Sequence, residues 1–101
     1  MFIRMLNFQI RENKKPEVVA IMDNLVPKIR SPKGCKDCMF VMHESDDHYA
    51  LLVFWNARED AEAAANFIGP RLIPALNRIS KENVTPRLYE VYQPVVLQEQ
   101  R

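Results

Sequence analysis

Residues Tyr49 to Asp60 read YALLVFWNARED, and this stretch decides the fold more than any other part of the chain. Its first part, Tyr49 to Trp55, is continuously apolar, which predicts a central strand buried on both faces. Asn56 follows, with Glu59 three residues later, and this spacing is typical of a helix start at which the Asn56 amide caps a free N–H group. We therefore expect a buried strand that runs directly into a capped helix.

The residues before this stretch predict two strands and a helix. Phe2 to Ile10 alternates as a strand does and carries apolar residues on both faces. An apolar stripe at helical spacing then runs from Val18 to Ile29, and Pro27 is expected to kink or end this helix. Met39 to His43 forms a hairpin with the stretch from Tyr49, across the polar turn 44–47.

The residues after it predict a broken helix and a last strand. The alanine-rich helix from Ala57 is expected to stop at Gly69-Pro70 and to restart as a short segment from Leu72 to Ile79. A loop then leads to a final strand, Arg87 to Tyr92.

This order predicts an α+β fold, a ferredoxin-like βαββαβ unit with a four-stranded antiparallel sheet and helices on one face. Residues 1–93 are expected to form one domain and residues 94–101 a C-terminal tail that contacts a partner. The other sheet face is too apolar to remain exposed to solvent. We therefore expect a homodimer in which two sheets pack face to face as a dimeric α/β barrel.

The composition of the 101 residues excludes several function classes. A net charge of +1, without a clustered basic excess, argues against nucleic-acid binding. No apolar run approaches the ~20 residues that a membrane helix needs, and no signal peptide is recognisable. Two cysteines do not make a disulfide framework, so a cytoplasmic location is expected.

From Met1 to about Tyr92, the chain resembles the antibiotic-biosynthesis-monooxygenase-like group of dimeric α/β barrels. The resemblance rests on the element order, on Pro32-Lys33-Gly34 before Met39-Phe40-Val41, and above all on Leu52 to Asp60. That last segment is similar to the group's strand ending in tryptophan, followed by a capped helix with acidic residues. Some members oxygenate polycyclic phenols or quinols in an apolar cavity without metal or flavin, and others degrade haem.

The resemblance places Asn7 at the position of the asparagine of the haem-degrading members, and Trp55 at the strand-end tryptophan. The helical region from Ala57 to Ile79 contains neither histidine nor tryptophan, so a haem-ligating histidine is missing there. Haem degradation is thus disfavoured, and no cofactor is expected.

The predicted site combines Asn7 and Trp55 as catalytic residues with an apolar lining. An amide among apolar neighbours needs a partner, which is either a substrate oxygen or a nearby side chain. Trp55 either forms a wall against an aromatic substrate or anchors the core. The expected substrate-binding residues are Met5, Phe67, Leu72, Leu76 and Tyr89, and the Tyr89 phenol is either a proton relay or an interface residue.

Two further clusters have structural explanations. Cys35 and Cys38 form a lone CxxC that enters a strand, whereas a redox pair normally begins a helix, and a zinc site needs about four ligands. His43 and His48 flank a solvated turn, and no metal site is expected there.

These observations predict a cofactor-independent monooxygenase that acts on a small aromatic or quinol-type substrate. The alternative is a non-catalytic, small-molecule-binding or stress-associated dimeric protein on the same scaffold.

Overall fold

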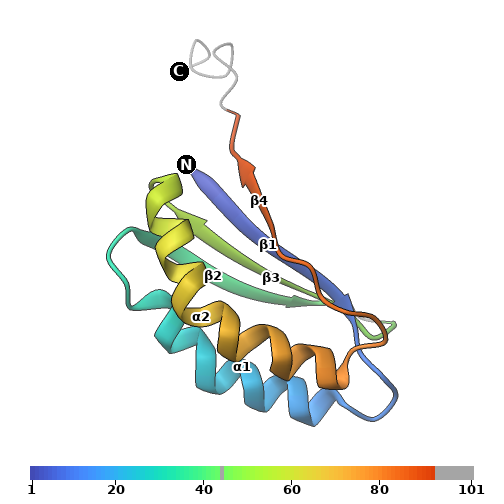
Figure 1. Ribbon diagram of the computed structural model, residues 1–101. Coiled ribbons are helices and arrows are strands. Elements are labelled where there is room, and N and C mark those ends of the chain that lie inside the picture. Colours follow the sequence, from blue (N-terminus) through green and yellow to red (C-terminus); the bar gives the residue numbers. More distant parts are fainter. Residues whose placement is uncertain (44, 93–101) are drawn as a thin grey trace.

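The computed structural model describes residues 1–43 and 45–92. Its elements follow the order strand, helix, strand, strand, helix, strand (Figure 1). Their bounds are β1 Phe2–Gln9, α1 Lys15–Arg30, β2 Cys35–Met42, β3 His48–Trp55, α2 Arg58–Ile79 and β4 Arg87–Glu90. The predicted α+β class and the βαββαβ arrangement are confirmed.

Within the described residues, the strands form one four-stranded antiparallel sheet in the order β2-β3-β1-β4. The two central strands are therefore β1 and β3. Leu6 lies opposite Leu51, and Arg4 lies opposite both Val53 and Leu88. Because directly opposed residues of an antiparallel pair point to the same face, this register decides which side chains meet the helices.

Both helices cover the same face of the sheet, and the core lies between these two layers (Figure 1). Alternate residues of β1 and β3 supply the sheet side of the core, and they are Leu6, Phe8, Tyr49, Leu51, Val53 and Trp55. The helices contribute their apolar stripes, which are Val18, Met22, Leu25 and Ile29 from α1 and Ala61, Ala64, Ile68, Leu72, Leu76 and Ile79 from α2.

The predicted break in the second helix is wrong, because α2 continues through Gly69, Pro70 and Pro74. A proline inside a helix costs roughly 3 kcal/mol, since it removes a hydrogen bond and crowds the preceding turn. Both prolines are exposed, so their rings take up no space in the core. The buried side chains beyond them, Leu72, Leu76 and Ile79, each contribute about 1.5–3 kcal/mol by staying in register with the stripe.

The start of α2 also differs from the prediction. The helix begins at Arg58, and the extended residue before it, Ala57, makes no side-chain capping hydrogen bond. Asn56 is not the cap, because it lies one residue before the cap position, and its backbone N–H donates to the Gly34 carbonyl oxygen at 2.9 Å.

Three other boundaries move by a few residues. Pro27 neither ends α1 nor prevents the burial of Ile29, since the helix continues to Arg30. Strand β2 begins at Cys35, earlier than expected, with an irregular register between Cys35 and Asp37. Strand β4 ends at Glu90, two residues before the predicted end.

The outer face, defined here as the sheet face opposite the helices, is rich in apolar side chains. Met39, Val41 and Tyr89 are 44–46% exposed on it. Their half-buried neighbours on this face are Ile3, Met5, Ala50, Leu52 and Phe54.

The predicted tail, residues 94–101, lies outside the described residues. In the part of the chain that is described, neither helix is long and apolar enough to cross a bilayer.

Candidate functional site

An apolar cavity lies between α2 and the centre of the sheet. Its volume is about 110 Å³. The sheet, α1 and the loop before β4 contribute Arg4, Leu6, Ile29, Leu51, Val53, Trp55 and Pro86, and α2 contributes Ala61, Ala64, Ala65, Ile68, Gly69, Leu72 and Ile73. All of these residues except Arg4 present apolar surface or backbone.

Small side chains on α2 create this space. The helix faces the sheet with Ala61, Ala64 and Gly69 at positions where larger residues would fill the gap. Because protein interiors otherwise pack to crystal-like density, such a run of small residues leaves room for a ligand. Gly69 has no atom within 4 Å of the place where a Cβ would stand.

The exposed members of the lining mark the mouth of the cavity. Ala65 and Pro86 are exposed, and Arg4, Gly69 and Ile73 are half-buried. The mouth therefore opens between α2 and the loop that precedes β4, while Leu6, Leu51 and Trp55 form the buried floor.

Two of the predicted site residues meet in this cavity. Trp55 is 2% exposed at the end of β3, and Leu72 is buried on α2, so both contribute walls. Leu76 belongs to the same helical stripe, but it is completely buried in the core and does not line the cavity.

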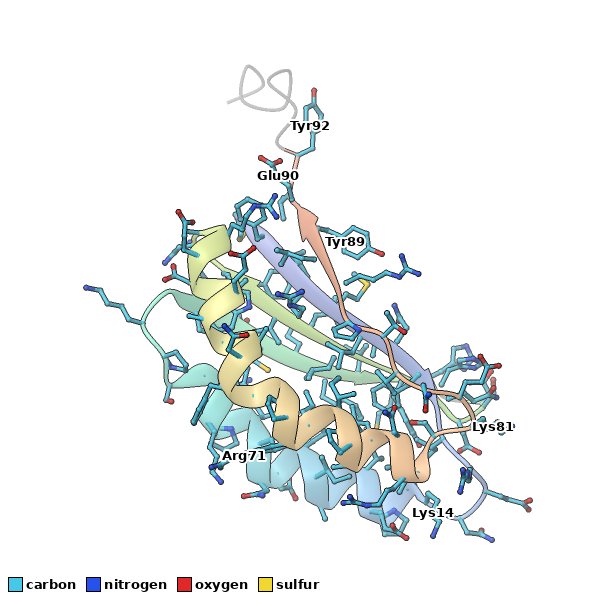
Figure 2. All side chains as sticks on the ribbon, in the orientation of Figure 1. Lys14, Arg71, Lys81, Tyr89, Glu90 and Tyr92 are labelled. Atoms are coloured by element: carbon cyan, nitrogen blue, oxygen red, sulfur yellow. The ribbon has the colours of Figure 1, made fainter. Side chains whose placement is uncertain are left out.

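The other predicted residues lie elsewhere. Contrary to the sequence-based expectation of a buried amide, Asn7 is exposed, because its opposite residue is Ala50 and both point to the outer face. Met5 and Tyr89 share that face. Figure 2 shows Tyr89 projecting from β4 away from the helices. Phe67 is 55% exposed on α2, where the Arg71 guanidinium lies 5.4 Å from its ring centroid.

Asn7 contributes to a separate polar pocket of about 260 Å³. This pocket lies where the end of β1 and the start of β3 meet the loop that carries Lys81, which Figure 2 labels at that end of the sheet. Its lining consists of Asn7, Phe8, Gln9, His48, Lys81, Glu82 and Asn83. The structure thus separates Asn7 from the cavity that contains Trp55.

Arg4 is the functional candidate that reasoning from the sequence missed. It stands on the helix-facing side of β1 and is the one charged residue among the described residues that line the cavity. Burial lowers the pKa of its guanidinium, while the negative charge of Glu62 acts in the opposite direction. The sequence does indicate this position, because Arg4 is an even number of residues away from Leu6 and Phe8 and therefore shares their face of the predicted strand.

The two cysteines lie in β2 as free thiols. Burial raises the pKa of the Cys38 thiol to about 11 and also raises the pKa of Cys35. Since the thiolate is the reactive form, both groups are poor nucleophiles at neutral pH.

The hairpin turn brings two imidazoles to one carboxylate. The Nδ1 atoms of His43 and His48 lie 3.4 and 3.2 Å from Asp46 Oδ1. Neither these three groups nor any other set of three histidine, cysteine, aspartate or glutamate side chains among the residues described is arranged so that it could hold a metal ion.

Comparison with known proteins identifies the fold. No protein-family model and no curated protein sequence matches the chain. An antibiotic biosynthesis monooxygenase of known structure is 19% identical, with a TM-score of 0.79 over 92% of this chain and 100% of that chain. SnoaB, a cofactor-independent oxygenase from Streptomyces nogalater, is 13% identical, with a TM-score of 0.73 over 93% of this chain and 95% of that chain. The haem degrader MhuD from Mycobacterium tuberculosis, solved with two haems in its active site, is 14% identical, with a TM-score of 0.70 over 94% of this chain and 99% of that chain.

The chain therefore has the antibiotic-biosynthesis-monooxygenase-type fold, and the resemblance expected from the sequence is confirmed at the level of fold. Proteins with this fold include a cofactor-independent oxygenase and a haem degrader. Since one fold hosts different chemistries, the function has to be argued from the site of this chain.

Proposed function

We propose that the protein is a cofactor-independent monooxygenase that acts on a small phenol- or quinol-type substrate in the cavity beneath α2. The observation that carries this proposal is an apolar cavity with a single charged group, in a fold that an oxygenase shares. An apolar cavity with a few polar groups is the ordinary form of a small-molecule site.

The cavity volume limits the size of the substrate. An engineered apolar cavity of about 150 Å³ accepts benzene, so the 110 Å³ cavity matches a single ring after a small widening. A polycyclic substrate would extend beyond this volume and out of the mouth. We therefore expect a single-ring substrate whose polar end lies at the mouth.

The proposed reaction draws all its electrons from the substrate. The phenolic O–H loses its proton to water, and the anion passes one electron to dioxygen. The radical pair then forms a C–O bond at a ring carbon that carries hydrogen, and the peroxide takes up a proton. Loss of water, with cleavage of the C–H and O–O bonds, leaves a carbonyl. One oxygen atom enters the product, the other becomes water, and the substrate supplies four electrons.

The residues of the cavity would favour this reaction by excluding water. Trp55 and Leu72 would hold the ring, and the low polarity of the walls strengthens any electrostatic contact with the substrate anion. The catalytic role expected for Asn7 stays a prediction, and it would place the chemistry at the outer face rather than in this cavity.

A second candidate function is binding without catalysis. It is favoured by the lining, which offers no titratable side chain other than Arg4 among the described residues, and so no general base. In this case the protein would hold or sequester the same class of molecule.

Oxygen uptake separates these functions. Purified protein, treated with a chelator, is mixed with single-ring phenols and quinols under isotopically labelled dioxygen, and uptake, product mass and binding are measured. We expect one labelled oxygen atom in a quinone product.

Ala64→Leu fills the cavity and should abolish turnover, whereas Ala63→Leu, on the exposed side of α2, should leave it unchanged. Binding without uptake would support the second function, and an absence of binding would exclude both.

We also propose that the outer face pairs with a second copy of the chain, as the exposed Met39, Val41 and Tyr89 suggest. Analytical ultracentrifugation should find a dimer at micromolar concentration. Leu52→Lys, at the centre of that face, should give a monomer, and Val19→Lys on α1 should not. A monomeric wild-type protein would contradict the proposed pairing. The cytoplasmic location stays a prediction.

A further inference from the structure

Arg4 occupies an unusual place for an arginine. It lies on β1, which has a hydrogen-bonded strand on each side, and its opposite residues Val53 and Leu88 are both apolar. Its side chain is half-buried at the cavity, beneath α2. Central strands rarely carry a charge on the core side, because moving a charge out of water is costly unless a partner compensates it.

No such partner is present in the described part of the chain. Arg4 makes no hydrogen bond and no ion pair there, whereas Arg30 bonds a backbone carbonyl oxygen and Arg58 stacks on a phenylalanine ring. Glu62 is the acidic residue whose charge acts on Arg4, but its carboxylate forms no salt bridge with the guanidinium and is exposed on α2. The guanidinium donors therefore remain available at the mouth of the cavity.

We propose that Arg4 binds an anionic oxygen of the ligand, so that the molecule in the cavity is a single-ring carboxylate or phenolate. This inference rests on the cavity of the proposed function and names the class of its ligand. The ring enters the apolar interior, and the charged oxygen stays at the mouth, where the guanidinium donates hydrogen bonds to it. Arginine suits this role because it stays protonated and its planar fork fits a carboxylate.

The position of Arg4 also predicts which molecules are rejected. A neutral ring of the same shape gains only the apolar contacts, and a cationic ring is repelled. Glu62 should weaken the binding of every anion, because its negative charge acts at the same place.

The test compares benzoate with benzamide, which has nearly the same shape but no charge, by isothermal titration calorimetry. Wild-type protein should bind benzoate about tenfold more tightly than benzamide. Arg4→Met, which keeps the length of the side chain, should reduce this preference to within about twofold, and Arg4→Lys should restore part of it. Glu62→Gln should tighten benzoate binding alone. Arg11→Met is the matched control, since Arg11 is exposed and lines no pocket described here.

A measurement on the unmodified chain covers the case in which Arg4→Met does not fold. The NMR signal of the Arg4 Nε–H group should shift on addition of benzoate, or of phenol at a pH that ionises it, and not with benzamide. Equal affinities for benzoate and benzamide, with both lost in Ala64→Leu, would overturn the role of Arg4 and leave the cavity site intact. If neither ring bound, the cavity of the proposed function would itself be refuted.

Discussion

The Arg30 guanidinium donates a 2.7 Å hydrogen bond to the carbonyl oxygen of Cys38, and so joins the last turn of α1 to β2. Since β2 is an edge strand, some of its carbonyl groups have no partner strand. The same guanidinium lies 3.9 Å from the Asp37 carboxylate. Arg30 thus holds the helix against an otherwise open edge of the sheet.

Arg30→Met should lower the free energy of unfolding by about 1 kcal/mol, because it removes a charged donor from a half-exposed hydrogen bond. Urea denaturation measures the change. Arg11→Met makes a matched control and should change stability by less than about 0.5 kcal/mol. Equal stability of both variants would show that the Arg30 contact contributes nothing.

The two glycines should respond to alanine in opposite directions. Gly34 has φ +96°, and a Cβ there would meet the side chain of Asp60, with 2.9 Å to its Cβ atom. Gly34→Ala should therefore lower the free energy of unfolding by about 2 kcal/mol. Gly69 is helical and has free space around it, so Gly69→Ala should raise stability by roughly 0.5–1 kcal/mol. Thermal unfolding of the two variants tests both signs, and a stable Gly34→Ala protein would contradict the contact with Asp60.

Ser80 has a buried hydroxyl oxygen without a hydrogen-bond partner among the described residues. An unsatisfied buried hydroxyl costs about 1–3 kcal/mol, so Ser80→Ala should raise the free energy of unfolding, by about 1 kcal/mol. Ser31→Ala, which removes an exposed hydroxyl, should have little effect. A loss of stability in Ser80→Ala would mean that the hydroxyl has a partner, such as a bound water.

The Asp46 carboxylate should titrate below its ordinary pKa of 3.8. The largest cause is the hydrogen bond that it accepts from the His48 backbone N–H at 3.0 Å, and the charges of the two histidines add to it. A carboxyl group whose pKa falls on folding stabilises the fold above its unfolded pKa, and this contribution is lost as the pH falls through the folded value. NMR titration of the Asp46 carboxyl carbon measures the shift.

Asp46→Ala should accordingly be more destabilising at about pH 7 than at about pH 2.5. Asp46→Asn keeps an acceptor for the His48 N–H and should lose less stability near neutrality. A penalty for Asp46→Ala that did not depend on pH would contradict the stabilising role of the carboxylate.

The spacing of apolar residues was sufficient to predict the strands and helices and their order, because alternation and helical spacing are local properties of the chain. It failed at Gly69-Pro70, where the local cost of a proline is smaller than the gain from keeping Leu72 and Leu76 in the core. That gain depends on packing against the sheet, and a rule that considers only neighbouring residues in the sequence does not include it.

The site was only partly predictable, for a related reason. Alternation alone puts Asn7 and Leu6 on opposite faces, but both faces of β1 are apolar, so the sequence does not say which one the helices cover. The register of Leu6 with Leu51 decides it, and register depends on contacts between distant residues. The sequence predicts Trp55 and Leu72 as lining residues, but it does not point to Arg4, because an arginine on a strand ordinarily lies in solvent.

The alanine-lined face of α2 has a consequence for how this protein could adapt to bulkier molecules. Alanine can be shortened only to glycine, so substitution at Ala61, Ala64 or Ala65 can make the cavity smaller but can hardly enlarge it. Room for a fused-ring compound would have to come from shortening Ile68, Leu72 or Ile73, or from a shift of the helix away from the sheet. Changes in specificity toward larger compounds should therefore be sought at these three residues and in the loops that flank α2, at Asn56–Ala57 and at residues 80–86.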